Sequence, residues 1–328
     1  MKKKIRFAIL GAGVIAPSHA DAVRSLSDAA LVGVADKSPE RAKAFADRYG
    51  IRAYLSPDEL FADPEVDVIS ICTPSGLHKE QAIAAMEHGK HVLIEKPIAL
   101  CGADADCIIE ASERTGMLAS SVFQMRTEAG VRRVRQLIEE GAFGKITSCS
   151  LLMNFWRDDA YYAAGSWRGT WKYDGGGALM NQGIHGIDLL ICLLGMPHVE
   201  AAQVRTALHR IETEDLAAAL LSFPCGAVGT VLATTCAYPG FARQLEISGD
   251  RGHAILQEGT LEKLIVNGKE VDLSDSDTPE EPEYLRHADQ MRNLIDAIRG
   301  QASLLLDAAE GAKAVRVIEE IYRLGGIR

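Results

Sequence analysis

Near its N-terminus, the 328-residue chain carries an apolar run followed by closely spaced glycines: Ile5-Arg6-Phe7-Ala8-Ile9-Leu10-Gly11-Ala12-Gly13-Val14-Ile15-Ala16. The run predicts a buried strand, and the G-x-G-x-x-A pattern predicts a turn from this strand into a helix. In such a turn the first glycine permits the bend, the second admits a pyrophosphate, and a small third residue lets helix and strand pack closely. The helix amino end then faces the phosphates. We therefore expect Gly11, Gly13, Val14 and Ile15 to bind a dinucleotide.

A second predicted strand, residues 30–35, points to the same kind of cofactor. It ends at Asp36, 23 residues after Gly13. A carboxylate at this position accepts hydrogen bonds from the ribose hydroxyls and repels a 2′-phosphate. Asp36 therefore favours NAD, whereas the neighbouring Lys37 and Arg41 leave NADP open.

Strands and helices continue to alternate as far as residue 122, which is the pattern of a doubly wound parallel sheet. Two of these strands, residues 66–72 and 91–94, are each followed by polar residues or prolines. Ligands of open α/β sheets bind outside the carboxyl ends of the strands. The residues at these ends are therefore further cofactor-binding candidates: Thr73, Pro74, His78, Glu95 and Lys96.

Lys96 is also a candidate for chemistry. An ammonium just past the end of a parallel strand could polarise a substrate oxygen or stabilise an alkoxide. The alternative is a surface lysine that precedes a loop proline.

After about residue 123 the alternation gives way to short strands, and we expect a second, α+β domain with a large, mostly antiparallel open sheet. Asn267-Gly268 lies between two apolar runs and predicts a hairpin. The expected division is a dinucleotide-binding domain over 1–122 and a substrate-binding and oligomerisation domain over 123–328. A helix over 308–324 could pack back on the first domain. Because open sheets commonly cover a face by self-association, we expect a homodimer or homotetramer.

Within the second domain, Gly175-Gly176-Gly177 leads into an apolar segment that contains Asn181, His185 and Asp188. If a helix begins near residue 178, these three side chains lie on one face, at i, i+4 and i+7. A histidine can move a proton near neutral pH, although a hydrogen-bonded core histidine is the alternative.

The segment before these glycines, residues 155–174, holds all three tryptophans, with cations between them. Flat rings suit the apolar faces of a sugar, and cations suit a carboxylate or phosphate; packing under an insertion is the alternative. Trp167 and Arg168 are therefore substrate-binding candidates. To these we add Gln124, Lys96, Asn181 and His185.

The overall composition excludes several other classes of protein. A formal net charge of −10 argues against nucleic acid or an anionic membrane as the main partner. Seven scattered cysteines without a C-x-x-C pattern suggest neither a disulfide framework nor a zinc site, so we predict no metal. The basic and apolar N-terminus could pass for a secretory signal, but glycines interrupt it and the strand and turn explain it better. No other run approaches a membrane span, and we expect a cytoplasmic protein.

Over essentially its whole length the chain resembles the Gfo/Idh/MocA family, named for glucose-fructose oxidoreductase, inositol dehydrogenase and rhizopine catabolism. The resemblance rests on the glycine turn, Asp36, Thr73-Pro74, Glu95-Lys96-Pro97, and the triple glycine that leads to His185. It implies a Rossmann domain followed by a sheet domain, with substrate bound against the nicotinamide. It further implies that Lys96 and His185 are catalytic, that the Lys96–Pro97 peptide is cis, and that the oligomer is built on the sheet.

One position departs from the inositol dehydrogenase pattern, in which an aspartate usually stands four residues before the catalytic histidine. Here that residue is Asn181, which can hold neither a proton nor a charge. With the tyrosines at 161–162 and residues 165–171, the segment from Asn181 to His185 looks more like the nucleotide-sugar and glycoside 3-dehydrogenases.

We therefore expect an NAD-dependent oxidoreductase that oxidises a secondary alcohol at C3 of a pyranose, which could be a free sugar, a glycoside or a nucleotide sugar. His185 would act as the base, Lys96 would hold the alkoxide, and Asn181 would position His185 or a neighbouring hydroxyl. The alternatives are an inositol dehydrogenase and a non-catalytic sugar sensor that binds a dinucleotide.

Overall fold

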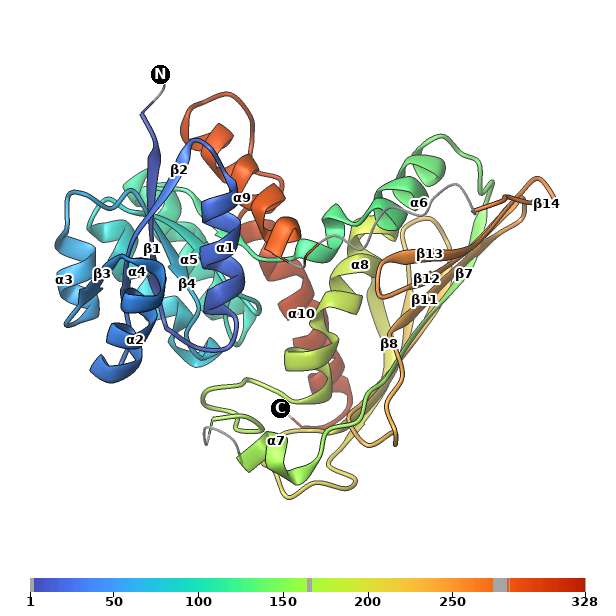
Figure 1. The fold of residues 1–328 in the computed structure, drawn as a ribbon. Helices are drawn as coiled ribbons and strands as arrows, with labels where there is room; N and C mark the ends of the chain where they lie inside the picture. The colour runs from blue at the N-terminus through green and yellow to red at the C-terminus, as the bar shows by residue number, and fades with distance from the viewer. Residues whose placement is uncertain (1–2, 164–166, 274–281, 283, 328) are drawn as a thin grey trace. The chain divides into compact units, whose positions relative to one another are not determined.

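The computed structural model describes residues 3–163, 167–273, 282 and 284–327 (Figure 1). The chain forms two compact units. The first comprises Met1–Gln124 with Glu281–Ala312, and the second comprises Met125–Glu280 with Lys313–Arg328.

The first unit is built on a six-stranded parallel sheet with the order β3-β2-β1-β4-β5-β6. Its strands are β1 (Ile5–Leu10), β2 (Ala29–Ala35), β3 (Arg52–Tyr54), β4 (Val68–Ile71), β5 (His91–Ile94) and β6 (Ala119–Ser121). Its helices are α1 (Ala16–Ser25), α2 (Pro39–Tyr49), α3 (Pro57–Ala62), η1 (Ser75–Leu77), α4 (His78–Glu87), α5 (Gly102–Thr115) and α9 (Tyr284–Ile298). The strand order reverses between β1 and β4, which is where doubly wound sheets bind ligands. The predicted Rossmann fold is therefore confirmed.

The second unit contains an eight-stranded sheet with the order β14-β13-β12-β11-β7-β10-β9-β8. Its strands are β7 (Ile146–Asn154), β8 (His198–Arg205), β9 (Leu216–Ser222), β10 (Val228–Thr234), β11 (Gln244–Gly249), β12 (Gly252–Gln257), β13 (Thr260–Val266) and β14 (Lys269–Glu270). All pairs are antiparallel except β7 with β10. The predicted hairpin joins β13 to β14, where Asn267 and Gly268 both have positive φ angles, 51° and 73°.

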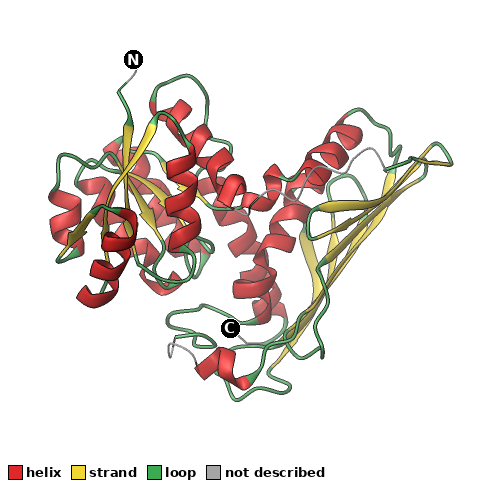
Figure 2. Ribbon diagram, viewed as in Figure 1, coloured by secondary structure: helices red, strands yellow, loops and turns green. Residues whose placement is uncertain are grey.

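Helices cover one face of this large sheet. The helical segments that begin in the second unit are η2 (Gln124–Thr127, whose first residue closes the first unit), α6 (Ala129–Glu139), α7 (Asp159–Ala163), η3 (Ala178–Gly183) and α8 (Ile184–Leu194). The last helix, α10 (Ala308–Leu324), starts in the first unit and ends in the second. Figures 1 and 2 show α6 and α8 on the same side of the sheet, and among the described residues no helix lies on the opposite side. The expected open sheet is thus confirmed.

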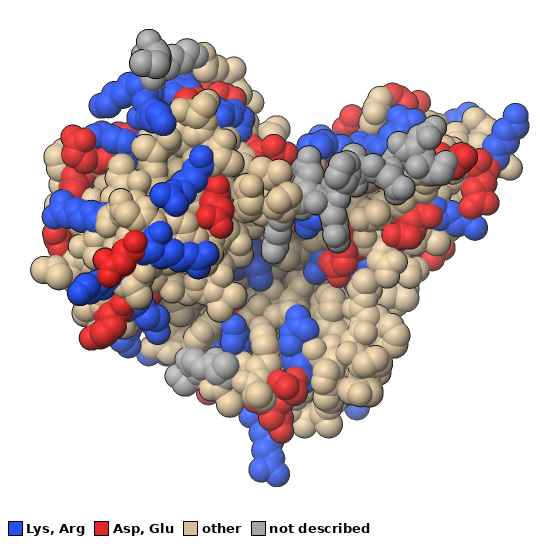
Figure 3. Space-filling model, in the orientation of Figure 1, with Lys and Arg blue, Asp and Glu red and all other residues tan. Residues whose placement is uncertain are grey.

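Charged side chains of both signs are mixed on the molecular surface. On the face drawn in Figure 3, Lys and Arg are interspersed with Asp and Glu over the first unit. Some form local ion pairs, such as Arg52 with Glu59 at 2.6 Å. None of the described helices is long and apolar enough to cross a membrane. All seven cysteines are free thiols.

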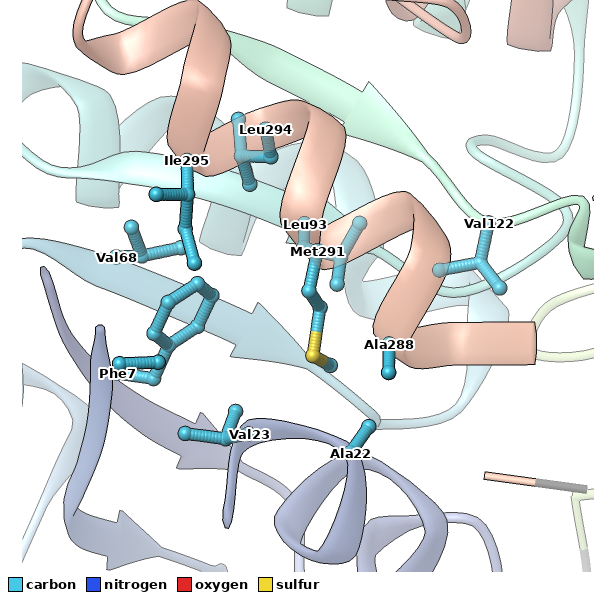
Figure 4. Close-up of a cluster of buried hydrophobic side chains, with 11 residues drawn as sticks. Phe7, Ala22, Val23, Val68, Leu93, Val122, Ala288, Met291, Leu294 and Ile295 are labelled. Atoms are coloured by element: carbon cyan, nitrogen blue, oxygen red, sulfur yellow. The ribbon is translucent and has the colours of Figure 1, made fainter. Parts of the chain in front are cut away.

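Helix α9 packs in the first unit, although we expected residues 123–328 to form the second domain. Met291, Leu294 and Ile295 are fully buried against the sheet, beside Phe7 of β1 and Val68 of β4 (Figure 4). The apolar stripe of α9 was visible in the sequence, but a stripe does not specify which sheet it covers. The chain therefore returns to its first unit before entering α10.

Truncating Leu294 tests this packing. We expect Leu294→Ala to lower the free energy of unfolding by about 2–5 kcal/mol, because it leaves a cavity beneath α9. The matched control is Leu305→Ala in the same unit, where the leucine is 67% exposed and the expected change is within about 0.5 kcal/mol. Urea denaturation measures both values, and equal effects would contradict the placement of α9.

Candidate active site

The glycine turn after β1 has the shape that a dinucleotide requires. Gly11 has a φ angle of 101°, and a Cβ there would lie 2.8 Å from the carbonyl carbon of Cys72, so only glycine fits. A Cβ on Gly13 would meet nothing closer than the Cys72 oxygen at 3.9 Å. The protein therefore leaves the space beside Gly13 open, as the approach of a pyrophosphate demands. Val14 is 90% exposed, and Ile15 precedes the first turn of α1.

Asp36 ties this turn to the end of β2. Its Oδ2 accepts a hydrogen bond from the Ala12 N–H at 2.8 Å, and its Oδ1 accepts one from the Ser38 N–H at 2.7 Å. Arg41 pairs with the same Oδ1 at 2.7 Å through a largely exposed guanidinium. Lys37 is exposed. The structure thus holds the carboxylate where the sequence predicted it, with an exposed cation beside it.

The residues after β4 and β5 are held together by a buried histidine. The ring nitrogens of His78 lie 2.9 Å from the Thr73 carbonyl oxygen and 2.8 Å from the Pro97 carbonyl oxygen. Burial lowers the pKa of His78. The His78 side chain, which we predicted at the cofactor, therefore supports the two loops that follow these strands. Pro74 precedes η1, and the Lys96–Pro97 peptide is cis, as predicted.

In the second unit, the triple glycine leads into a π-helical turn. This turn, η3, precedes α8. Our prediction of a regular α-helix from residue 178 is therefore wrong for residues 178–183, and the α-helix begins at Ile184. The glycines are required by close packing: a Cβ on Gly176 would lie 2.1 Å from the Tyr322 hydroxyl oxygen, and one on Gly177 would lie 2.0 Å from the Glu214 carbonyl oxygen. The wider turn changes which side chains share a face.

Asn181 and Asp188, expected on one face with His185, have different partners. The Asn181 amide donates to Oδ1 of Asp174 at 2.6 Å. Asp188 is buried and accepts two hydrogen bonds from Arg126, at 2.6 and 2.9 Å. Asp188 therefore fixes α8 to η2. His185 is half-buried on the first turn of α8, and its Nδ1 atom is buried.

Sequence reasoning missed Asp174, which is 1% exposed and also accepts the Gly169 N–H at 2.8 Å. It lies in an irregular loop, where no periodic pattern could reveal it. A carboxylate is therefore present near the start of α8, the helix that carries His185, and it accepts a hydrogen bond from the side chain of Asn181.

The aromatic segment joins this network through Gln182. Gln182 accepts from Arg157 at 2.5 Å and donates to the Tyr161 hydroxyl at 2.6 Å and to Oδ1 of Asn181 at 3.1 Å. The Arg168 guanidinium lies over the Tyr161 ring at 4.4 Å and the Trp167 ring at 5.3 Å. Residues 164–166 are outside the described part of the chain. The remaining candidate, Gln124, is the first residue of η2.

Glu214 holds the glycine segment through hydrogen bonds to its backbone. The carboxylate is fully buried and accepts from the Gly177 N–H at 2.9 Å, the Leu179 N–H at 2.8 Å and the Tyr322 hydroxyl at 2.8 Å. Burial raises the pKa of Glu214 to about 7, against the opposing effect of these donors. Its charge therefore changes near neutral pH.

A nucleotide-binding parallel sheet in one unit, with an open sheet and a histidine helix in the other, defines a class of two-unit NAD-binding oxidoreductases. Residues 5–123 match the model of the oxidoreductase family with an NAD-binding Rossmann fold (GFO_IDH_MocA), and residues 131–255 match the GFO/IDH/MocA C-terminal domain. The chain belongs to the Gfo/Idh/MocA family, and it is an NAD-binding oxidoreductase of that family.

Relatives of the chain act on sugars and polyols. It is 27% identical to the myo-inositol 2-dehydrogenase of Thermotoga maritima over 80% of this chain and 78% of that protein. The WlbA dehydrogenase of Bordetella pertussis, solved with NADH and UDP-GlcNAcA, is 32% identical, with a TM-score of 0.91 over 99% of this chain and 97% of that one. Levoglucosan dehydrogenase, at 23% identity and a TM-score of 0.90 over 99% and 97% of the two chains, shares the fold.

Exchanging the partners of the Asn181–Asp174 bond tests its role. Asn181→Asp would place two carboxylates at hydrogen-bond distance, so we expect a loss of about 1–3 kcal/mol in stability and a lower turnover. Adding Asp174→Asn should restore both, because the new amide can donate to the carboxylate introduced at position 181 while its oxygen accepts from the Gly169 N–H. Chemical denaturation and steady-state kinetics measure the effects. A double variant no better than the single one would contradict the assignment.

The pH dependence of stability tests Glu214. Because its pKa is raised from 4.5 to about 7, the folded state holds the proton more tightly, and this stabilisation is lost as pH rises through 7. We expect the unfolding free energy of the wild type, relative to Glu214→Gln, to fall by about 3 kcal/mol between pH 4.5 and about pH 8. Urea titrations across this range measure the difference, and a constant difference would refute the shift.

Proposed function

We propose that this protein is an NAD-dependent dehydrogenase that oxidises the C3 hydroxyl of a pyranose carried on a nucleotide or another glycosidic group. The observation that carries the proposal is the full-length similarity to WlbA, which was solved with NADH and UDP-GlcNAcA. Asn181 supports the same branch, since the inositol pattern has an aspartate at this position.

The residues of the first unit fit NAD. The open side of Gly13, the exposed Val14 and the carboxylate of Asp36 match the pyrophosphate and the ribose hydroxyls. NAD, when bound, accepts the hydride from the carbinol carbon. Because Asp36 disfavours a 2′-phosphate, we propose NAD over NADP. Arg41 beside it is a cation that could pair with the 2′-phosphate of NADP.

Two side chains handle the hydroxyl in this proposal. His185 takes its proton, and Nε2 is the acceptor because Nδ1 is buried. The Lys96 ammonium holds the oxygen as its negative charge develops. Asn181, fixed by Asp174, positions the substrate or His185.

The aromatic segment supplies substrate contacts in the same proposal. Trp167 offers a flat face, and Arg168 a cation that suits a carboxylate or phosphate on the sugar. Lys96 and Gln124 complete the proposed set with Asn181 and His185.

A second candidate is oxidation of an inositol, which the similarity to the Thermotoga maritima enzyme favours. An inositol lacks the nucleotide or glycosidic group, so it would make no use of a cation such as Arg168.

We also propose self-association through the sheet face opposite α6 and α8. Leu152, Leu220 and Val228, on β7, β9 and β10, are 36%, 41% and 51% exposed. Apolar side chains on a broad sheet face favour burial against a second copy.

Substitution of the two proposed catalytic residues tests the reaction. We expect Lys96→Ala and His185→Ala each to lower kcat by at least about a hundredfold, as the loss of an oxyanion donor or a general base does. The control is His198→Ala, an exposed histidine of the second unit, which should leave kcat unchanged.

The assay follows absorbance at 340 nm with NAD and NADP in parallel, over a panel of nucleotide sugars, simple glycosides, free sugars and inositols. We expect the fastest turnover with NAD and a nucleotide sugar. Near-normal kcat in either alanine variant would refute the catalytic roles. Tight NAD binding without reduction on any substrate would indicate a sensor.

A further inference from the structure

A buried carboxylate lies directly before the proposed catalytic lysine. Oε2 of Glu95 accepts the backbone N–H of Lys96 at 3.1 Å. Oε1 lies 2.7 Å from Nε2 of His19 on α1, whose Nδ1 lies 2.5 Å from the Ser70 hydroxyl oxygen. An ionised carboxylate can only accept, so His19 carries its proton on Nε2 and its Nδ1 accepts from Ser70.

A second histidine approaches the same carboxylate from the far end of the chain. Nε2 of His287, on α9, lies 3.7 Å from Oε1 of Glu95, and the His287 ring packs on the His19 ring with centroids 4.9 Å apart. His287 is 1% exposed, and among the described residues neither of its ring nitrogens has a hydrogen-bond partner.

The position of His287 is costly for a polar side chain. Its neighbours on α9, Ala288 and Met291, are buried in the apolar cluster of Figure 4. A buried nitrogen without a partner destabilises a fold, and an aromatic hydrocarbon would pack here without that penalty. Packing alone therefore does not account for a histidine at this position.

The electrostatics indicate what the two histidines do. Burial alone would raise the pKa of Glu95, but the hydrogen bond from His19 and the approach of His287 hold the pKa well below its usual range. Glu95 thus keeps its charge in the interior. A charged acceptor orients the Lys96 N–H more strongly than a neutral one.

Two other interpretations fit less well. Ser70, His19 and Glu95 follow the order of a nucleophilic triad, but all three are at most 8% exposed, so a substrate could not reach them. His19, Glu95 and His287 could also ligate a metal, since their ligand atoms lie within 4.8 Å of one another. However, Nε2 of His19 already donates its proton to Glu95. A nitrogen that binds a metal must be unprotonated.

We propose that His287 is a positioning residue which, together with His19, holds Glu95 and through it the backbone of Lys96. This inference rests on the proposed function, in which Lys96 acts on the substrate. Helix α9 thereby stabilises the backbone at Lys96, although the two lie almost two hundred residues apart in the sequence.

The test compares His287→Phe with Met291→Leu. Phenylalanine keeps the ring and removes its nitrogens, while the control alters the packing of the same helix. Two quantities are measured: steady-state kinetics, and the rate at which acetic anhydride acetylates Lys96, followed by mass spectrometry. We expect His287→Phe to lower kcat by about tenfold with KM within about twofold, as for a displaced transition-state contact. The Lys96 acetylation rate should change by about threefold or more, since lysine reactivity follows its surroundings.

His287→Gln supplies a second variant, because its amide keeps a polar N–H that can approach Glu95. It should recover part of the kcat that phenylalanine loses. Both variants should keep the wild-type circular dichroism spectrum, and Met291→Leu should match the wild type in every measurement.

The outcomes separate this inference from the proposed function. If His287→Phe and His287→Gln match Met291→Leu in kcat and in Lys96 acetylation while Lys96→Ala abolishes turnover, the positioning role is refuted and the function stands. If Lys96→Ala keeps its turnover while His287→Phe alters Lys96 acetylation, the positioning role stands and the function fails. A stoichiometric metal ion in the wild type, lost in His287→Phe, would also overturn the inference.

Discussion

A carboxylate removed from water must find hydrogen-bond donors, and this constraint shapes both units of the protein. Glu95, Asp174 and Glu214 are all buried, and each is held by donors from other elements. Each also accepts a hydrogen bond from a residue in or next to a segment of the proposed site. Glu95 holds the backbone of Lys96, and Asp174 holds the side chain of Asn181. Glu214 holds Gly177, in the glycine segment that precedes Asn181. The interior polar groups thus hold the segments that carry the proposed catalytic residues.

Features that depend on near neighbours in the chain could be predicted from the sequence. The turn at Gly11 needs a positive φ angle and a close approach to Cys72, just after β4, and the glycine pattern predicts both. The hairpin at Asn267 follows from two adjacent residues. The alternation of strands and helices likewise specified the parallel sheet, because each βα unit forms locally. The cis peptide before Pro97 came from the family resemblance alone.

Features that depend on distant packing could not be predicted. Nothing in the stripe of α9 says that it covers the first sheet. The π-helical turn of η3 follows Gly176 and Gly177, which pass close to Tyr322 and Glu214, two residues that lie far away in sequence. For the same reason, Asn181 was recognised as a departure from a pattern, while its buried partner Asp174 was not.

The central claim is that the enzyme removes hydrogen from C3 of a pyranose and gives it to NAD. The most direct measurement uses the best nucleotide-sugar substrate, labelled with deuterium at C3, and mass spectrometry of the reduced cofactor after one turnover. The account predicts one deuterium in the NADH and a slower hydride transfer, because the C–D bond is broken. Unlabelled NADH, formed while the deuterium stays in the sugar, would contradict it.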